Sequence, residues 1–294
     1  MHAGPNDPAR STATLARLRQ AGRILTAVGI GLAVVVWVIY FPAKGNPADA
    51  ATYYGIDMDD MYGGWRLGAS DAYQYSPVFA QLTWPLRQLP FEAYVAVVRG
   101  LSLIAVVWLA GPFTAVVLFL PPVASEINAG NINLFLAVAI ALGLRYPATW
   151  AAILLTKVTP GVGLLWFVVR RRWRSLGIAL GATALVAGVS FVIAPEQWLA
   201  WVNLLATNRG LSTASYPYYV ELWVRLPIAI VITLAAGAWG RWWPVAIATA
   251  IAAPSLYFPT QAIATGALPG LREDGWAALE RRVTRRERQP DGAG

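Results

Sequence analysis

Long apolar runs separated by short polar stretches make up most of the chain between residues 23 and 270. The first run, 23–43, has about 20 residues, the length that an α-helix needs to cross about 30 Å of hydrocarbon. No small-residue cleavage site follows it, so we interpret it as a membrane span and not as a signal peptide. Comparable runs at 91–110, 175–194 and 222–240 predict further spans.

Other apolar runs are short or interrupted. The runs 111–124 and 132–144 are near the lower length limit for crossing, and 243–270 is broken by "APSLYFPTQ". A further run contains Lys157 and Pro160, and an ammonium at the bilayer centre is costly unless it faces a wet or paired site. Two half-length helices that meet at "KVTPG" avoid this cost. We therefore expect an all-α transmembrane bundle of about eight to ten spans, including broken or re-entrant helices.

Composition supports a membrane protein and suggests an orientation. The chain is 57% hydrophobic and 13% charged, and it has no cysteine that could form a disulfide. Its net charge of +8 comes from basic residues at the ends of apolar runs, which indicates orientation and not nucleic-acid binding. We therefore expect a cytoplasmic segment 1–22, a transmembrane domain 23–270 and a cytoplasmic tail 271–294. The loops 44–90 and 195–221 then lie outside the cell membrane.

The acidic stretch "DAATYYGIDMDDMYGG", residues 49–64, is unusual in a chain with so few charges. The expected topology places it outside the cell. Within it, Asp57 and Asp59 have the Asp-x-Asp form that holds a divalent cation, and hard oxygen ligands suit Mg²⁺ or Mn²⁺. Such a short pattern is common by chance, and exposed acids are most often solvated. We therefore expect no metal cofactor, with a cation at these two residues as the alternative.

The same topology brings several polar segments to the external side. They are the acidic loop, "EINAGNIN" at 126–133, the break at Lys157 and the break at 255–261. Irregular backbone at membrane depth is tolerated where it is buried in protein or lines a polar cavity. We therefore expect these segments to share one site.

The order of these motifs resembles glycosyltransferase family 87. The chain has "DAATYY", then "YQYSP", "GNIN" and "KVTP", followed by "RRRWR", within a likeness that covers residues 24–270. The family consists of integral-membrane enzymes of the GT-C fold, including mannosyltransferases that depend on a polyprenyl-phosphate-mannose donor. The resemblance implies a donor of this kind, a lipid or glycan acceptor and contacts with membrane lipids.

The resemblance also implies roles for particular residues. The family's Asp, followed four positions later by Tyr, falls on Asp49 and Tyr53, which makes Asp49 the implied catalytic base. The Gly-Gln-x-Asn element of the family has Asn131 in place of Gln, and the proline expected directly after Lys157 arrives at Pro160. With the acids of the same loops, the candidate substrate-binding residues are Tyr53, Asp59, Asp60, Tyr73, Tyr75, Glu126, Asn131, Asn133 and Lys157.

These residue types suit sugar transfer from a lipid phosphate. One carboxylate can take the proton of an attacking hydroxyl, and a fixed cation can stabilise the departing phosphate. Two alternatives remain open: a transporter or lipid flippase, which commonly has broken helices and internal repeats, and a non-catalytic membrane subunit related to such enzymes. We see no internal repeat.

Overall fold

The computed structural model describes residues 8–63, 73–207, 220–254 and 256–288, and every regular element in these ranges is helical. The expected all-α membrane fold is confirmed.

Among the described residues, four helical stretches are long and apolar enough to cross a membrane. They lie at or around the runs 23–43, 91–110, 175–194 and 222–240, as expected from the sequence. The first begins earlier than expected, because helix α1 starts at Pro8 and includes most of the basic N-terminal segment. The stretches are Ala13–Ala43 (α1, Pro8–Val35; η1, Val36–Tyr40; α2, Phe41–Lys44), Phe91–Leu118 (α5, Phe91–Ala110; η3, Gly111–Phe113; α6, Thr114–Leu118), Trp173–Ile193 (α11) and Leu222–Trp239 (α13).

The remaining apolar runs form short helices. Helices α7 (Pro121–Ala129) and α8 (Asn133–Gly143) meet at 113° and count together as one broken or re-entrant span. The described ranges therefore hold four or five candidate spans, fewer than the eight to ten expected, because the interrupted runs do not become continuous helices. The shorter apolar elements are η4 (Pro147–Thr149), α9 (Trp150–Leu154), η5 (Thr159–Leu164), α10 (Leu165–Val169), α14 (Trp243–Ile251) and η6 (Phe258–Ala267).

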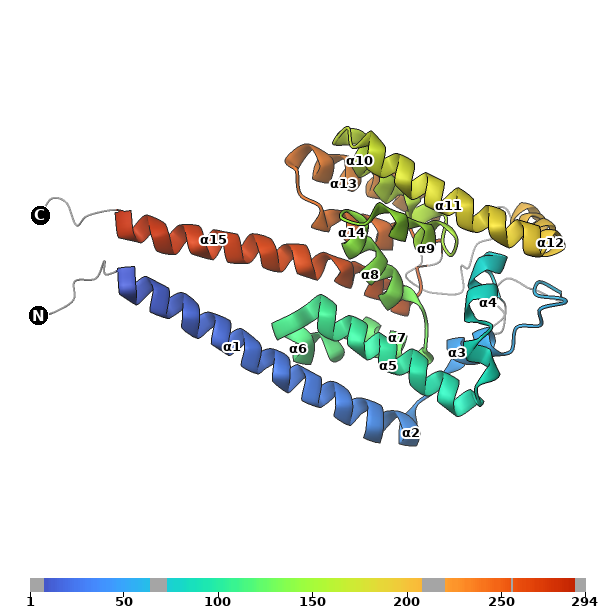
Figure 1. The fold of residues 1–294 in the computed structure, drawn as a ribbon, viewed down its shortest axis with the longest axis horizontal. Coiled ribbons are helices and arrows are strands. Elements are labelled where there is room, and N and C mark those ends of the chain that lie inside the picture. Colours follow the sequence, from blue (N-terminus) through green and yellow to red (C-terminus); the bar gives the residue numbers. More distant parts are fainter. Residues whose placement is uncertain (1–7, 64–72, 208–219, 255, 289–294) are drawn as a thin grey trace, which may run out of the picture.

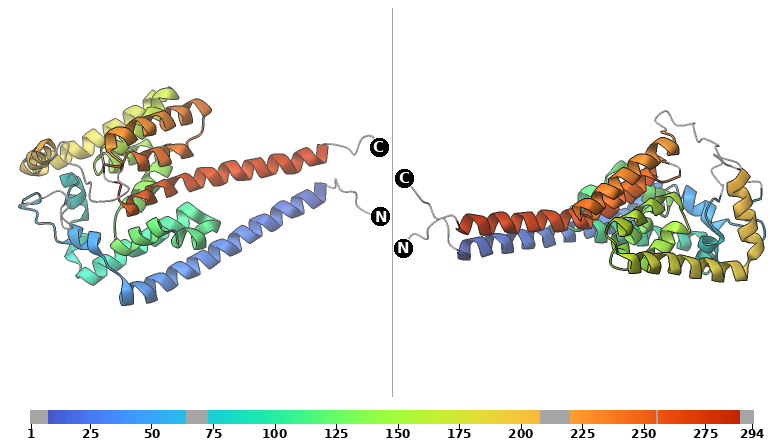
Figure 2. Two further views of the ribbon diagram at one scale, coloured as in Figure 1. Left: turned by 180° about the vertical axis from the view of Figure 1, so that it is seen from behind. Right: turned by 90° about the horizontal axis from the view of Figure 1, so that it is seen from above.

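The two ends of the molecule differ in character (Figures 1 and 2). Helices α1 and α15 (Leu268–Arg288) extend side by side from the body, so both termini lie at one end. The opposite end carries α3 (Ala48–Tyr54), α4 (Pro77–Thr83), η2 (Leu86–Gln88) and α12 (Pro195–Thr207). An ion pair of 3.3 Å joins Arg19 of α1 to Glu280 of α15, and the Arg19 guanidinium lies over the ring of Trp276.

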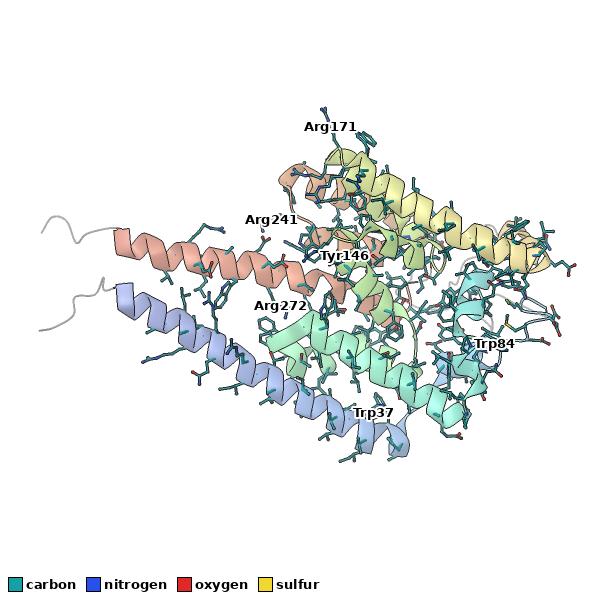
Figure 3. The ribbon with its side chains drawn as sticks, in the orientation of Figure 1. Trp37, Trp84, Tyr146, Arg171, Arg241 and Arg272 are labelled. Atoms are coloured by element: carbon teal, nitrogen blue, oxygen red, sulfur yellow. The ribbon has the colours of Figure 1, made fainter. Side chains whose placement is uncertain are left out.

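Several arginine side chains lie toward the end that carries the termini. Arg171, Arg241 and Arg272 lie on the part of the body nearer the termini, and Trp84 lies near the opposite end (Figure 3). Arg241 forms a 2.6 Å ion pair with Asp274 of α15. The side of the membrane on which each terminus lies stays a prediction.

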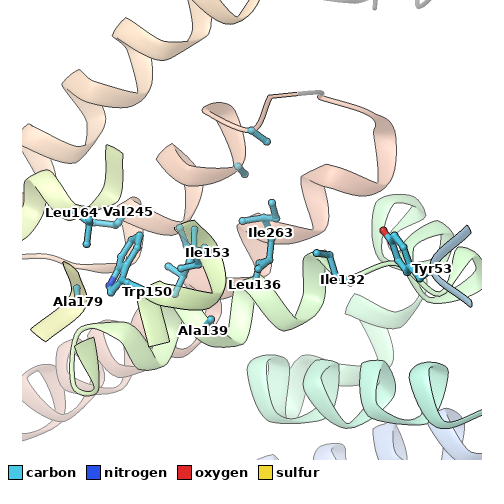
Figure 4. Packing of buried hydrophobic residues seen from close by; sticks show 14 of the residues in the cluster. Tyr53, Ile132, Leu136, Ala139, Trp150, Ile153, Leu164, Ala179, Val245 and Ile263 are labelled. Carbon is cyan, nitrogen blue, oxygen red and sulfur yellow. The ribbon is translucent and has the colours of Figure 1, made fainter. Parts of the chain in front are cut away.

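A closely packed core holds the short helices in place (Figure 4). Trp150 of α9 is fully buried and meets Phe167 of α10 edge to face, with ring centroids 6.4 Å apart. Gly143 and Gly163 make room for the indole, because a Cβ at either position would lie 2.6 Å or less from it. Core packing of this density fixes α8, which begins at Asn133, and α9, which ends three residues before Lys157.

Candidate active site

Asp49 stands in the first turn of α3, at the end of the molecule opposite the termini. Its side chain is partly buried, and its Oδ2 accepts a 2.8 Å hydrogen bond from the Asn131 amide nitrogen. Burial raises the pKa of Asp49, while the Asn131 hydrogen bond and the Lys157 ammonium lower it, and burial is the largest effect. A carboxylate with a raised pKa is suited to accept a proton near neutral pH.

Asn131 connects Asp49 to Tyr53, which is buried, and through it to Tyr75, which is partly buried. Its Oδ1 accepts hydrogen bonds from the Tyr53 hydroxyl at 2.9 Å and from the backbone N–H of Ile132 at 2.6 Å. The Tyr53 and Tyr75 hydroxyls are 3.1 Å apart. Asp49 and Tyr53 lie one turn apart on the same face of α3, so both can contact a single residue of the α7–α8 loop.

Gly130 allows this loop to approach α3. It adopts a left-handed conformation with φ of 69°, and a Cβ there would lie 2.7 Å from the Cβ of Ala50. Only glycine meets both requirements without strain.

We expect Gly130→Ala to reduce the free energy of unfolding by about 1–3 kcal/mol, because alanine would be strained in the left-handed region. It should also displace Asn131 from Asp49. Thermal unfolding in detergent measures the first effect. Gly181→Ala in α11 is the matched control, since no atom lies within 4 Å of the added Cβ. Equal stability of the two variants would contradict this reading of the loop.

A second polar group surrounds Lys157, between α9 and η5. The Lys157 ammonium donates a 2.7 Å hydrogen bond to Oδ1 of Asn133, and the Asn133 amide nitrogen donates one of 2.8 Å to Oε2 of Glu126. The backbone N–H of Asn133 donates to Oε1 of the same carboxylate. Glu126 and Asn133 have no exposed surface, and Lys157 is 7% exposed. This burial favours a supporting role for Glu126 and Asn133, behind Lys157.

The two groups are adjacent. Asn131 and Asn133 are two positions apart, and Asp49 and Lys157 are close enough for each to affect the other's ionisation. The structure therefore brings together six of the residues expected from the sequence, around the junction of α7 and α8. These six are Asp49, Tyr53, Glu126, Asn131, Asn133 and Lys157, with Tyr75 joined to them through Tyr53.

Other expected residues have different surroundings. Asp57, Asp59 and Asp60 are exposed, and Oδ1 of Asp57 accepts a 2.9 Å hydrogen bond from the backbone N–H of Asp59. Across the ranges that the structure describes, no group of three or more His, Asp or Glu residues is arranged to hold a metal ion. Tyr73 is buried, and its hydroxyl donates to the Ser76 carbonyl at 2.7 Å. Ser255, at the start of the expected 255–261 break, lies outside the described residues.

Arg99 was not expected at the site. It is 5% exposed, its guanidinium donates to the carbonyl of Asn128, and it lies 4.5 Å from the centre of the Phe41 ring. Asn128 in turn accepts a 2.9 Å hydrogen bond from the backbone N–H of Asn46 through its side chain. Arg99 thus ties the end of the first span to the end of α7 and helps to position Asp49. An arginine inside the apolar run 91–110 was the available signal.

The comparisons with known proteins identify the family of the chain. The model of Glycosyltransferase family 87 matches residues 73–273. The chain belongs to glycosyltransferase family 87. The match includes Tyr75, Asn131 and Lys157, whereas Asp49 and Tyr53 precede it.

A curated relative of this family-87 chain is the polyprenol-phosphate-mannose-dependent alpha-(1-2)-phosphatidylinositol pentamannoside mannosyltransferase of Mycolicibacterium smegmatis. The two are 25% identical over an alignment of 214 residues, which covers 62% of this chain and 52% of the relative. The chain thus spans about half the length of the curated relative that it matches. No solved structure matches the chain.

Proposed function

We propose that this family-87 protein transfers a sugar, mannose, from a polyprenyl-phosphate-mannose donor to a hydroxyl of a lipid or glycan acceptor on the external side of the cell membrane. The observation that carries the proposal is the convergence of a partly buried carboxylate, Asp49, and a buried ammonium, Lys157, on two asparagines, Asn131 of the α7–α8 loop and Asn133 at the start of α8. The dependence of the curated relative on polyprenol-phosphate-mannose supports this choice of donor.

Asp49 acts as the general base in this proposal. The acceptor's O–H bond breaks and its proton passes to Asp49, while the oxygen forms a bond with the anomeric carbon. The bond from that carbon to the phosphate oxygen breaks, and its electron pair leaves with the phosphate. The transition state has oxocarbenium character, as in glycoside hydrolysis. Removing the proton as the new bond forms keeps the attacking oxygen from accumulating positive charge.

Lys157 stabilises the departing phosphate. A positive charge fixed in a site of low polarity interacts more strongly with developing negative charge than it would in water. Asn133 and Glu126 hold the ammonium from behind, so little reorganisation is needed during the reaction. Tyr53 and Tyr75 bring aromatic rings to the same place, and such rings can pack against a sugar. The exposed Asp59 and Asp60 are available for contacts with sugar hydroxyls.

The charge distribution supports the membrane orientation in this proposal, with both termini in the cytoplasm. Arg171, Arg241 and Arg272 lie toward the termini, and arginine-rich ends of spans remain in the cytoplasm. Asp49 and α12 lie at the other end and would face outward. A donor whose sugar is on the outer side of the membrane could then bring that sugar to Asp49 directly, because both lie on the same side.

The pH dependence of transfer should show the raised pKa of Asp49. The base is active when ionised, so the rate should rise with pH through a pKa above 3.8, the ordinary value, and fall as the pH drops through it. Initial rates between pH 4 and 9, roughly spanning the titration of a perturbed carboxyl, measure this. A rate that is already maximal at pH 4 would contradict a raised pKa.

Reconstitution tests the function. Liposomes that contain the purified protein are supplied with radiolabelled polyprenyl-phosphate-mannose and membrane lipid acceptors, and the labelled products are separated. We expect label to move to the acceptor fraction only with active protein. Uptake of solute or flipping of the donor without transfer would instead support a transporter. The absence of both transfer and transport would support a non-catalytic subunit.

A further inference from the structure

The orientation of the Asn131 amide is fixed by a group that can only donate. The backbone N–H of Ile132 lies 2.6 Å from one terminal atom of the side chain, so that atom must be the oxygen, Oδ1. The other terminal atom is therefore the NH₂ group, which only donates. It lies 2.8 Å from Oδ2 of Asp49. Oδ2 must accordingly act as an acceptor, and it carries no proton while this contact is intact.

Tyr53 and Tyr75 donate hydrogen bonds in the same direction, toward Asp49. Oδ1 of Asn131 also accepts the hydroxyl proton of Tyr53 at 2.9 Å. Because Tyr53 has a single proton, Tyr75 must donate across the 3.1 Å contact between the two hydroxyls. Burial raises the pKa of Tyr53 and of Tyr75, so both remain protonated donors. The donors run in one direction, from Tyr75 through Tyr53 and Asn131 to Asp49.

We propose that Asn131 is a positioning residue that reserves Oδ2 of Asp49 as a hydrogen-bond acceptor, so that Oδ1 is the atom that receives the proton of the acceptor hydroxyl. This inference rests on the proposed function of Asp49 as a base. Oδ1 accepts no hydrogen bond from any residue that the structure describes, and Asp49 is only partly buried, so this oxygen is available to a substrate.

The orientation of the neighbouring amide, that of Asn133, is also fixed by a group that can only donate. Lys157 can only donate, so its contact identifies Oδ1 of Asn133 and directs the Asn133 NH₂ group to Glu126. Each asparagine takes hydrogen bonds at its oxygen and gives one to a carboxylate. Asn131 in the α7–α8 loop and Asn133 at the start of α8 thereby set the direction of two hydrogen-bond chains, one ending on the base and one ending on Glu126, the buried counter-charge of Lys157.

The test compares the pH profiles of two variants, Asn131→Leu and Asn131→Asp, with that of the wild type. Leucine is close in size and cannot donate, so the pKa of Asp49 should rise and the ascending part of the profile should move to higher pH. We expect kcat to fall about tenfold to a hundredfold, the effect of losing a hydrogen bond to a charged group, with little change in KM for the donor. An aspartate at position 131 can still accept the hydrogen bonds from Ile132 and Tyr53. It places a second carboxylate beside Asp49, so the pKa of Asp49 should rise further and the ascending limb should move to still higher pH.

The charged and titratable groups that face Asp49 are unchanged in both variants: Lys157, Glu126, Tyr53 and Tyr75. Tyr54→Phe is the control, because the Tyr54 hydroxyl donates to the Leu89 carbonyl, away from Asp49. It should leave the profile in place. A structural role for Asn131 would lower the rate equally at every pH, and ascending limbs that stay at the wild-type position in both variants would overturn the proposal.

A second measurement separates this proposal from the proposed function. Infrared titration follows the protonated carboxyl band that disappears in Asp49→Asn, and it needs no turnover. The midpoint of that band should move to higher pH in Asn131→Leu and Asn131→Asp. An unmoved midpoint would overturn the role of Asn131, whereas transfer that persists in Asp49→Asn would overturn the role of Asp49 as the base.

Discussion

Replacing Asp49 with asparagine should reduce the rate of mannose transfer by about a hundredfold to ten-thousandfold, the usual contribution of a general base. The variant keeps an oxygen that can accept the Asn131 hydrogen bond, so the α3–loop contact should survive. The loss should fall on kcat, because the proton transfer occurs in the transition state. Steady-state kinetics with radiolabelled donor in reconstituted liposomes provide the measurement.

Glu92→Gln is the matched control for this variant. Glu92 is an exposed acid in the first turn of α5 and has no part in the site. Its replacement should leave the rate within about twofold of wild type, as expected for a surface change. Similar rates for Asp49→Asn and Glu92→Gln would remove Asp49 from the mechanism.

Replacing Lys157 with methionine should have the second large effect. Loss of a fixed cation at the departing phosphate should lower kcat about a hundredfold to a thousandfold. The change should also destabilise the fold by about 3–5 kcal/mol, because Glu126 would be buried without its counter-charge. Transfer kinetics and thermal unfolding measure the two effects.

A double variant separates catalysis from stability. Glu126→Gln combined with Lys157→Met removes both buried charges and should restore much of the lost thermal stability. It should not restore transfer, since the phosphate would still lack its cation. A double variant that regains both stability and transfer would show that Lys157 acts only through folding.

Much of the fold follows from the sequence, because membrane spans require long apolar runs. The four continuous spans coincide with such runs, and the break between α7 and α8 coincides with "GNIN". The number of spans is harder to predict from the sequence. Whether a short run crosses, bends back or packs inside the protein depends on its neighbours, as the fully buried Trp150 illustrates.

The polar cluster is also partly readable from the sequence. Asp49 and Tyr53 are one helical turn apart, and a lysine inside an apolar run requires a partner. The sequence alone does not predict which residues of different helices lie close together. It gave no indication that Asn133 separates Lys157 from Glu126, or that Arg99 holds Asn128. The roles of Asp57, Asp59 and Asp60 remain predictions.

The most direct test of the account is a topology map of single cysteines in this cysteine-free chain. Asn46→Cys and Val158→Cys place exposed probes beside Asp49 and Lys157, and Ala13→Cys and Arg281→Cys place probes on α1 and α15. A membrane-impermeant maleimide added outside intact cells should label positions 46 and 158, and should label 13 and 281 only after the cells are opened. Labelling of 46 and 158 from opposite sides of the membrane would contradict a shared site for the base and the cation.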